Sequence, residues 1–566
     1  MKRSLAGLAL AALLSSPLPA ASVAHGRGGA VAAAEENAAR VGIAILKKGG
    51  NATDAAVALA FALAVTWPEA GNIGGGGFWL SRDAKGRTLA IDFRERAPRA
   101  ARRDMFVQPE RPGQKAPSST HGPLASGVPG SVAGLALAHR RGGRLPWKTV
   151  VDPAVRLARD GFVMSENVHS SIADEKARLA ADPETAAIFL PNGEPPPVGS
   201  VFRQPALART LQAIRERGED GFYRGQVARE FEAQQKKAGG LITRGDLALY
   251  AAKARKPLVF PFRNGDVLTT PAPSSGPVLA EMALLAEQVG LDKLKPVDVS
   301  SAHLMVEIEK RAFADRNRYL GDPDFGDIPQ NLFTSAGRLK RLAATINPAR
   351  ATPVDALPNL AWRGTSTTHF SVVDAAGAAV SVTTTLNDSF GNARVAGGLG
   401  FLLNNEMDDF TTRPGEPNRY GLIQGEPNAI APGKRMLSAM CPSIATLEGL
   451  NALVWGSPGG STIPTTNFQI LVNVLLRGEN LEQAVAAPRF HQQDRPDVVQ
   501  IEPERFDAAW VQAMEGYGHS VGPRSKYSDW PTLGRVHAIM RRADGRLTAV
   551  ADPRSLGVAL VVNPEP

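Results

Sequence analysis

The chain has 566 residues, 43% hydrophobic and 21% charged, a composition that supports a substantial core and excludes a disordered protein. Its one cysteine, Cys441, excludes an internal disulfide framework and a cysteine-rich zinc site, and the nine histidines show no ligand spacing. The net charge of +9 is spread without long basic runs, so we expect no nucleic-acid partner, and nothing in the sequence implies a metal or a cofactor.

The N-terminus has the pattern of a secretory signal peptide. Lys2 and Arg3 precede a short apolar stretch at residues 5–14, and Ser22 and Ala24 place small residues at the two positions that determine cleavage. The stretch is too short to span a membrane as a helix. We expect removal of residues 1–24 and an exported, periplasmic protein without a membrane anchor; an uncleaved anchor is the alternative.

Two helices are predicted next. Residues 36–47 carry apolar side chains at helical spacing, and the glycine pair at 49–50 is typical of a helix end. Asn51 or Thr53 would cap a second, very apolar helix over residues 54–65.

Four consecutive glycines at residues 74–77 precede a strand-like segment at 78–80. Glycines allow backbone to approach backbone or a ligand closely. No Gly-Lys-Ser/Thr follows, which excludes a phosphate loop. A second strand is predicted over residues 89–93, directly before Arg94.

The middle of the chain, residues 150–350, is predicted to be mostly helical with proline-rich breaks. An apolar helix over residues 278–289 follows a Pro- and Gly-rich loop, and a charged helix is predicted over residues 307–319. Residues 351–364 form a poorly patterned linker.

After the linker the pattern changes to strands. Residues 367–373 and 379–386 alternate between apolar and polar side chains. Between them, Asp374 and Gly377 favour a type I turn with Gly377 in the left-handed conformation of a three-residue hairpin loop.

That loop sets the register of the hairpin. Thr367 is predicted opposite Thr385, with Asn387 two residues further along the same face. A slip of one residue would move one strand's side chains to the other face.

Several segments resemble the γ-glutamyltranspeptidases, beginning with the family's processing site at residues 365–371. The number, order and spacing of the motifs extend the resemblance from about residue 25 to the C-terminus. The other matching segments are Gly49 to Ala56, Gly71 to Phe78, Asp92 to Glu95, Leu403 to Phe410 and Gly456 to Ser461.

The resemblance implies the α/β (α+β) fold of the N-terminal-nucleophile hydrolases, a four-layer αββα sandwich formed jointly by two subunits. Self-cleavage would fall between Ser366 and Thr367. It would leave a large subunit (25–366) and a small subunit (367–566) with Thr367 as its new N-terminus, paired as an αβ heterodimer.

Cleavage before Thr367 suits the chemistry of a threonine. A hydroxyl is a poor nucleophile and needs an adjacent base, and a free α-amino group with a pKa of about 7.7–8.0 supplies one on the same residue. By resemblance, Thr385 orients the Thr367 hydroxyl, and the backbone N–H groups of Gly459 and Gly460 stabilise the oxyanion.

The resemblance also implies a pocket for the two charges of a γ-glutamyl group. Arg94 and Ser438 would bind the α-carboxylate, for which a planar guanidinium is well suited. Asn387, Glu406 and Asp409 would surround the α-ammonium. Two acids in an empty site would repel and raise a pKa.

Two positions depart from the family's usual residues, and one further loop resembles the family. Ala439 stands where the family often has a second serine, so we expect weaker binding of glutamyl donors or a different acyl group. Cys441 replaces a usual Ser or Thr and is expected to be a buried structural thiol. Residues 413–424 resemble a lid loop, with Tyr420 as its aromatic residue.

The expected activity is that of a γ-glutamyltranspeptidase and glutathione hydrolase, which passes the γ-glutamyl group of glutathione and related compounds to water or to amino acid or dipeptide acceptors. One alternative is a cephalosporin or glutaryl acylase of the same superfamily, which needs no ammonium pocket. The other is a non-catalytic periplasmic binding or scaffold protein that never matures.

Overall fold

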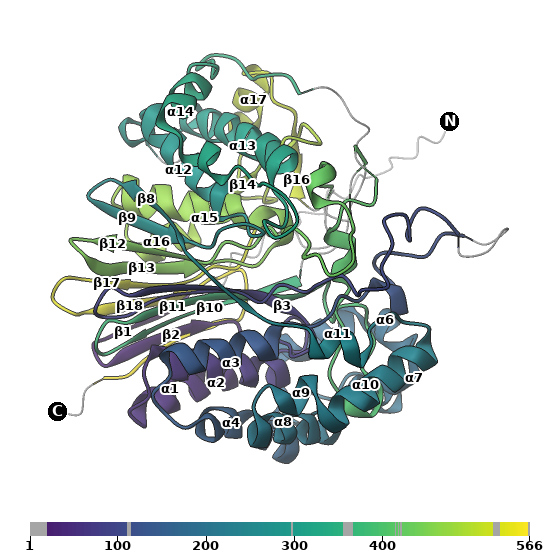
Figure 1. The fold of residues 1–566 in the computed structure, drawn as a ribbon. Coiled ribbons are helices and arrows are strands. Elements are labelled where there is room, and N and C mark those ends of the chain that lie inside the picture. Colours follow the sequence, from purple (N-terminus) through teal and green to yellow (C-terminus); the bar gives the residue numbers. More distant parts are fainter. Residues whose placement is uncertain are drawn as a thin grey trace, which may run out of the picture.

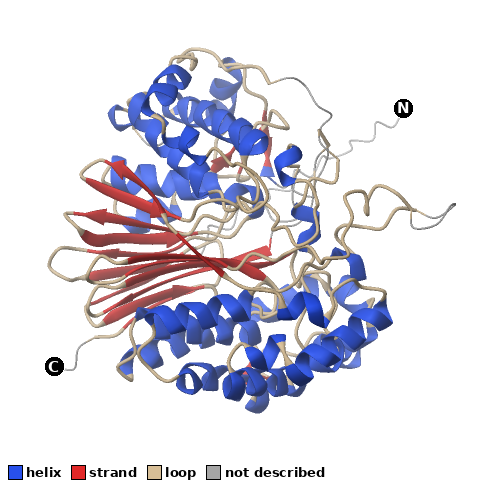
Figure 2. Ribbon diagram, in the orientation of Figure 1, coloured by secondary structure: helices blue, strands red, loops and turns tan. Residues whose placement is uncertain are grey.

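Two antiparallel seven-stranded sheets pack face to face and are covered on their outer sides by helices (Figures 1 and 2). The computed structural model describes residues 20–109, 115–295, 298–354, 366–413, 415–416, 418, 421–524 and 532–563. The arrangement confirms the predicted four-layer αββα fold.

Each sheet combines strands from before and after Ser366. The first sheet has the order β19 (Val558–Val561), β2 (Gly29–Ala33), β10 (Ser366–Asp374), β11 (Ala379–Asn387), β3 (Gly76–Arg82), β4 (Thr88–Asp92) and β7 (Lys253–Arg255). The second has the order β1 (Ser22–Gly26), β18 (Leu547–Ala551), β17 (His537–Arg541), β13 (Leu450–Gly456), β12 (Ser443–Leu447), β9 (Gly265–Thr269) and β8 (Leu258–Phe262).

One helical layer covers the first sheet and the other covers the second. The first layer contains α1 (Glu36–Lys47), α2 (Ala52–Thr66), α3 (Ser131–Gly142), α4 (Trp147–Asp160), α5 (Glu166–Asp174), α6 (Lys176–Ala180), α7 (Pro183–Phe189), α8 (Pro205–Arg217), α9 (Asp220–Tyr223), α10 (Gly225–Ala238) and α11 (Arg244–Ala248). The second contains α12 (Gly276–Gln288), α13 (Val299–Tyr319), α14 (Ala336–Ala343), α15 (Ile463–Leu471), α16 (Leu481–Ala486) and α17 (Ala508–Gly516). Two small sheets pair β5 (Phe162–Val163) with β6 (Val201–Phe202), and β15 (Val499–Ile501) with β14 (Phe490–His491) and β16 (Val521–Pro523).

Helix α2 shows how sequence determines this layering. Its side chains are apolar on all sides, and it is buried along almost its whole length between neighbouring helices and the first sheet. Asn51 caps it: its side-chain oxygen accepts a hydrogen bond from the Asp54 N–H, and the Asn51 N–H donates one to the Asp54 carboxylate. The cap resolves the predicted choice between Asn51 and Thr53.

The predicted hairpin is present in the predicted register. Thr367 pairs with Thr385, and Gly377 has a φ of 85° in the connecting turn. The register shifts between Ser366 and Thr367, so that Ser366 pairs with Asn387, whose φ is 80°. This bulge lies directly at the predicted cleavage point.

The glycine run at 74–77 serves backbone packing. A Cβ on Gly75 would lie 2.0 Å from the Thr385 carbonyl oxygen, and one on Gly77 would lie 2.3 Å from that of Thr383. Strand β3 therefore approaches β11 more closely than a side chain would permit, which fixes the strand that carries Thr385.

A strand hairpin interrupts the region predicted to be mostly helical. Strands β8 and β9 form the edge of the second sheet, and Pro261 lies within β8. An edge strand tolerates a proline because one of its sides has no ladder to complete. The proline and the exposed Val259 concealed the strand pattern in the sequence.

Only part of the predicted signal peptide lies within the described residues. Residues 1–19 lie outside the described residues, and the predicted boundary after Ala24 falls inside β1, which pairs with β18 from Ser22 to Gly26. None of the described helices is long and apolar enough to cross a membrane.

Candidate active site

A cavity at the end of the two sheets collects the predicted site residues from distant parts of the chain. It is lined by Arg94, Arg316, Thr367, Thr385, Asn387, Glu406, Asp409, Leu422, Ser438, Ala439, Met440, Gly460, Ser461 and Ile463. Gly459 lines an adjoining cavity together with Thr367. Tyr420 and the side chain of Ser366 lie outside the described residues, whereas Leu422 brings the predicted lid segment to the cavity.

Thr367 and Thr385 lie side by side at the open end of the β10–β11 hairpin, opposite the turn. The Thr367 hydroxyl lies 3.4 Å from the Thr385 hydroxyl, which accepts a hydrogen bond of 2.8 Å from the Asn387 N–H. Both threonines are buried. The register predicted from the turn residues, with Thr367 opposite Thr385, is therefore confirmed.

The Gly459–Gly460 pair provides donors beside Thr367. Strand β13 ends at Gly456, and the two glycines have φ values of 137° and 58°. Neither N–H donates a hydrogen bond within the described part of the chain. The 3-10 turn Gly460–Thr462 leads into α15, so the dipole of this helix points its positive end toward the cavity. Backbone N–H groups placed in this way can hold a negatively charged oxygen.

A buried charge cluster forms the other end of the cavity. The Arg94 guanidinium is fully buried, and its Nη1 lies 2.7 Å from Glu406 Oε2 and 3.2 Å from Glu95 Oε2. Its Nη2 pairs with Asp409. The residues that the sequence analysis assigned to opposite charges of a substrate are thus paired with one another in the structure.

Burial dominates the electrostatics of this cluster. Desolvation raises the pKa of Glu406 and of Asp409, and it raises that of Glu95 to about 7, in each case against the attraction of Arg94. Burial alone would lower the pKa of Arg94, but the three carboxylates outweigh it and raise that pKa. The predicted pKa effect of crowded acids is therefore present, with desolvation as its main cause.

Arg316 is a cavity residue that sequence reasoning missed. It projects from α13 and is buried, and its Nε donates a 2.9 Å hydrogen bond to Ser275 Oγ, which donates to the Ser438 carbonyl at 2.6 Å. Burial lowers its pKa to about 10. Helix α13 carries several charged residues, and nothing in their pattern indicates that this arginine points inward.

The Ser438–Ala439 segment lines the cavity beside Arg316. The Ser438 N–H donates to the Pro273 carbonyl at 2.8 Å, which fixes the segment against the loop before α12. Ala439 presents only a methyl group to the cavity. Cys441 is fully buried and burial raises the pKa of its thiol to about 12, as expected for an inert structural thiol.

Among the described residues, no group of His, Cys, Asp and Glu is arranged to hold a metal ion.

Comparison with known proteins gives consistent matches over nearly the whole chain. The family model described as gamma-glutamyltranspeptidase matches residues 38–562. A glutathione hydrolase proenzyme of Escherichia coli (strain K12) is 43% identical over 534 residues, covering 93% of this chain and 90% of the relative. One of Pseudomonas aeruginosa is 43% identical over 575 residues, covering 99% of this chain and 98% of the relative.

Solved structures match as well. A cephalosporin acylase from Bacillus halodurans superposes with a TM-score of 0.86 at 27% identity, covering 98% of this chain and 99% of the other. The gamma-glutamyltranspeptidase of Pseudomonas nitroreducens complexed with L-DON superposes with a TM-score of 0.54 at 41% identity, covering 58% of this chain and 96% of that chain.

Proposed function

The chain belongs to the gamma-glutamyltranspeptidase family, and we propose that Thr367 is its nucleophile, released by self-cleavage after Ser366. It is an enzyme that acts on glutathione and other γ-glutamyl compounds, and it is made as a proenzyme. The observation that carries the assignment of Thr367 is that its side chain lines the same cavity as Arg94, Glu406 and Asp409.

The proposed reaction needs no group beyond those in the cavity. The α-amino group of Thr367, once cleavage has freed it, takes the hydroxyl proton while Oγ bonds to the γ-carbonyl carbon of the donor. The developing oxyanion is held by the N–H groups of Gly459 and Gly460. The C–N bond then breaks, and the leaving amine takes the proton. Water or an acceptor amine attacks the γ-glutamyl ester and regenerates Thr367.

Binding of the donor is proposed as an exchange of ion pairs. The α-carboxylate of the γ-glutamyl group would replace Glu406 and Asp409 on the Arg94 guanidinium, and its α-ammonium would replace Arg94 beside the two acids. The exchange leaves every buried charge with a partner, which a donor with only one of the two charges would not do. Ser438 would support the carboxylate and Asn387 the ammonium.

An acylase activity is the second candidate, favoured by the similarity to the Bacillus halodurans cephalosporin acylase and by Ala439, which removes a hydroxyl from the carboxylate end. A glutaryl donor carries no ammonium, so it would leave Glu406 and Asp409 without their partner once its carboxylate engaged Arg94. The γ-glutamyl assignment is therefore the better supported one.

The test is release of the chromophore from a γ-glutamyl anilide by purified protein, with the glutaryl anilide as the matched donor that lacks only the ammonium. We expect release from the γ-glutamyl compound to be at least ten-fold faster, and to increase when a dipeptide acceptor is added. A preference for the glutaryl compound would establish the acylase instead. A gel run on the same preparation reports whether two subunits have formed.

We also propose that the chain matures into subunits 25–366 and 367–566 that remain paired, and that residues 1–24 direct export to the periplasm. The shared sheets support the pairing, because each of them contains strands from both segments. Cleavage after Ala24 would remove Ser22 to Ala24 from β1, whereas a mature N-terminus upstream of Ser22 would keep the strand whole. N-terminal sequencing of both subunits from a periplasmic fraction tests these points together.

A further inference from the structure

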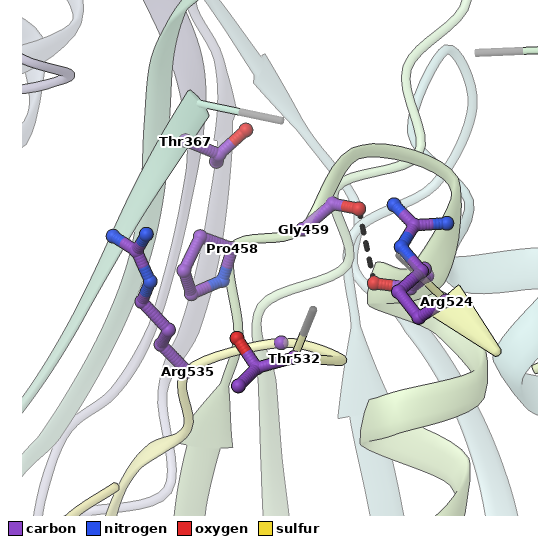
Figure 3. A pocket seen from close by; sticks show the side chains of 8 residues that line it. Thr367, Pro458, Gly459, Arg524, Thr532 and Arg535 are labelled. Atoms are coloured by element: carbon purple, nitrogen blue, oxygen red, sulfur yellow. Dashed lines mark hydrogen bonds between the residues drawn. The ribbon is translucent and has the colours of Figure 1, made fainter. Parts of the chain in front are cut away.

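The two peptide groups that carry the proposed oxyanion donors are both held by a side-chain hydroxyl on their carbonyl side. They are the Pro458–Gly459 and Gly459–Gly460 peptides, which follow β13, and Figure 3 shows Pro458 and Gly459 below Thr367. Neither peptide bond is cis. In a planar trans peptide the N–H points opposite to the C=O, so a contact that fixes the carbonyl also fixes the direction of the N–H.

Thr462 holds the Gly459 carbonyl. This carbonyl oxygen accepts a 3.0 Å hydrogen bond from the Thr462 hydroxyl, drawn as a dashed line in Figure 3, and one of 3.2 Å from the Thr462 N–H. Thr462 is only 1% exposed and ends the 3-10 turn that leads into α15. Because the carbonyl faces Thr462, the Gly460 N–H points away from it, and Gly460 itself lines the donor cavity.

Ser457 holds the Pro458 carbonyl in the same way. The Ser457 hydroxyl lies 2.7 Å from that carbonyl oxygen, and it accepts a 2.9 Å hydrogen bond from the Arg535 N–H. A serine hydroxyl has one hydrogen, which is thus available for the Pro458 carbonyl. The side chain of Ser457 is fully buried. The Gly459 N–H is therefore directed by the same kind of contact as the Gly460 N–H.

Glycines leave the orientation of the peptide between them open unless another group holds it. A rotation of the Gly459–Gly460 peptide changes ψ of Gly459 and φ of Gly460, and neither residue has a Cβ that would resist the change. A Cβ on Gly459 would also lie 2.4 Å from Thr462 Oγ1, so only a glycine lets the hydroxyl approach this closely. The glycines permit the arrangement, and the Thr462 hydroxyl determines which way the N–H faces.

We propose that Thr462 is a positioning residue for the oxyanion donors: its hydroxyl holds the Gly459 carbonyl and thereby keeps the Gly460 N–H directed at the carbonyl oxygen of the donor. Ser457 acts in the same way on the Gly459 N–H. Each hydroxyl acts through a peptide group and not on the substrate. Donors that are already oriented stabilise the developing negative charge without reorganising during the reaction. The inference rests on the proposed function, because it takes these two N–H groups as the donors to the oxyanion.

The first test compares Thr462→Val, which keeps the shape of the side chain and removes the hydroxyl, with Thr462→Ser, which keeps the hydroxyl. With a γ-glutamyl anilide as donor, we expect Thr462→Val to lower kcat by about ten-fold with little change in KM, and Thr462→Ser to recover most of the rate. Thr88→Val, at an exposed position of β4, is the matched control and should keep the wild-type kcat. A Thr462→Val enzyme with the wild-type kcat would overturn the inference while leaving the proposed function intact.

The second test separates the orientation of the N–H groups from a general loosening of the cavity. It uses two inhibitors: the boronic acid analogue of the γ-glutamyl group, which forms a tetrahedral adduct with a nucleophilic hydroxyl, and norvaline, which has the α-carboxylate and α-ammonium but no γ-carbonyl. In Thr462→Val the inhibition constant of the boronic acid should rise by about the factor by which kcat falls, whereas that of norvaline should stay unchanged. An equal rise for both inhibitors would show that Thr462 serves the packing of the cavity and would overturn the positioning role. A wild-type enzyme that the boronic acid does not inhibit would instead overturn the proposed nucleophile.

A Thr462→Val variant that fails to mature is replaced by Thr462→Cys, whose thiol is a weaker hydrogen-bond donor than a hydroxyl. Its inhibition constant for the boronic acid should exceed that of the wild-type enzyme, and its constant for norvaline should be unchanged. A wild-type constant for the boronic acid in this variant would overturn the inference.

Discussion

Thr367 and Thr385 are paired across strands β10 and β11, with their hydroxyl oxygens 3.4 Å apart. The pairing is set at the other end of the hairpin, where Gly377 adopts a φ of 85°. Thr385 is itself fixed by the N–H of Asn387, which donates to its hydroxyl. The neighbourhood of the proposed nucleophile is thus determined by a turn and a register within residues 367–387.

Thr367→Ala is expected to abolish both self-cleavage and turnover, because it removes the hydroxyl that each step uses. Thr367→Ser keeps a hydroxyl and should still mature and turn over, at a lower rate. Gel analysis and anilide hydrolysis measure the two effects. A cleaved and active alanine variant would remove Thr367 from the mechanism.

Thr385→Val should lower kcat by about ten-fold or more with little change in KM, because the substitution keeps the shape of the side chain and removes the hydroxyl beside Thr367 Oγ. Thr385→Ser, which restores the hydroxyl, is the matched control and should recover most of the rate. A valine variant with wild-type kcat would show that Thr385 serves only the packing of β11.

The hairpin and the helices near the N-terminus could be predicted because their determinants are local. A turn, a cap and a periodicity are each contained within about ten residues, and Asn51 and Gly377 carried that information. The glycine run was ambiguous, since contact with backbone and contact with ligand impose the same requirement. Only the fold shows that Gly75 faces the Thr385 carbonyl.

The same distinction between local and long-range determinants applies to the arginines of the site. Arg94 was predicted from the motif around it, whereas Arg316 lies in a segment without a motif and is buried by contacts that are distant in sequence. Sequence also gave no indication that Arg94 pairs with Glu406 and Asp409 in the structure. Long-range packing decides which charged side chains point inward.

Arg94→Ala is expected to raise KM for γ-glutamyl donors by an order of magnitude or more, because it removes the guanidinium proposed to bind the α-carboxylate and leaves three acids without their shared counter-ion. Arg102→Ala, at an exposed position, is the control. Initial-rate kinetics over a range of donor concentrations separates KM from kcat. An unchanged KM would place the donor carboxylate elsewhere, with Arg316 as the next candidate.

Donor binding should weaken as the pH falls. The pKa values of Glu406 and Asp409 are raised by burial, and that of Glu95 is raised to about 7, so the acids take up protons well above their ordinary range. A protonated Glu406 or Asp409 no longer attracts the donor ammonium, so KM should rise as the pH is lowered through their raised pKa values. The rate constant kcat should also fall on the acid side, as the Thr367 amine with an ordinary pKa of about 7.7–8.0 takes up a proton.

Glu95→Gln separates these two effects. The negative charge of Glu95 contributes to the raised pKa of Glu406, so removing that charge lowers the pKa of Glu406. The rise in KM should then move to lower pH, while the kcat profile stays in place. A shift of both profiles together would indicate that one group controls binding and chemistry.

Ala439→Ser should strengthen donor binding. The methyl group of Ala439 lines the cavity beside Ser438, at the end where Arg94 and Arg316 would receive the donor carboxylate. One added hydrogen bond of about 1 kcal/mol corresponds to a roughly five-fold lower KM, and a charged acceptor increases the effect. The exposed Ala543→Ser adds the same hydroxyl away from the cavity and should leave KM unchanged. Because both anilides carry that carboxylate, Ala439→Ser should lower KM for the γ-glutamyl and for the glutaryl anilide. If it lowers neither, the alanine does not limit binding at that end of the cavity.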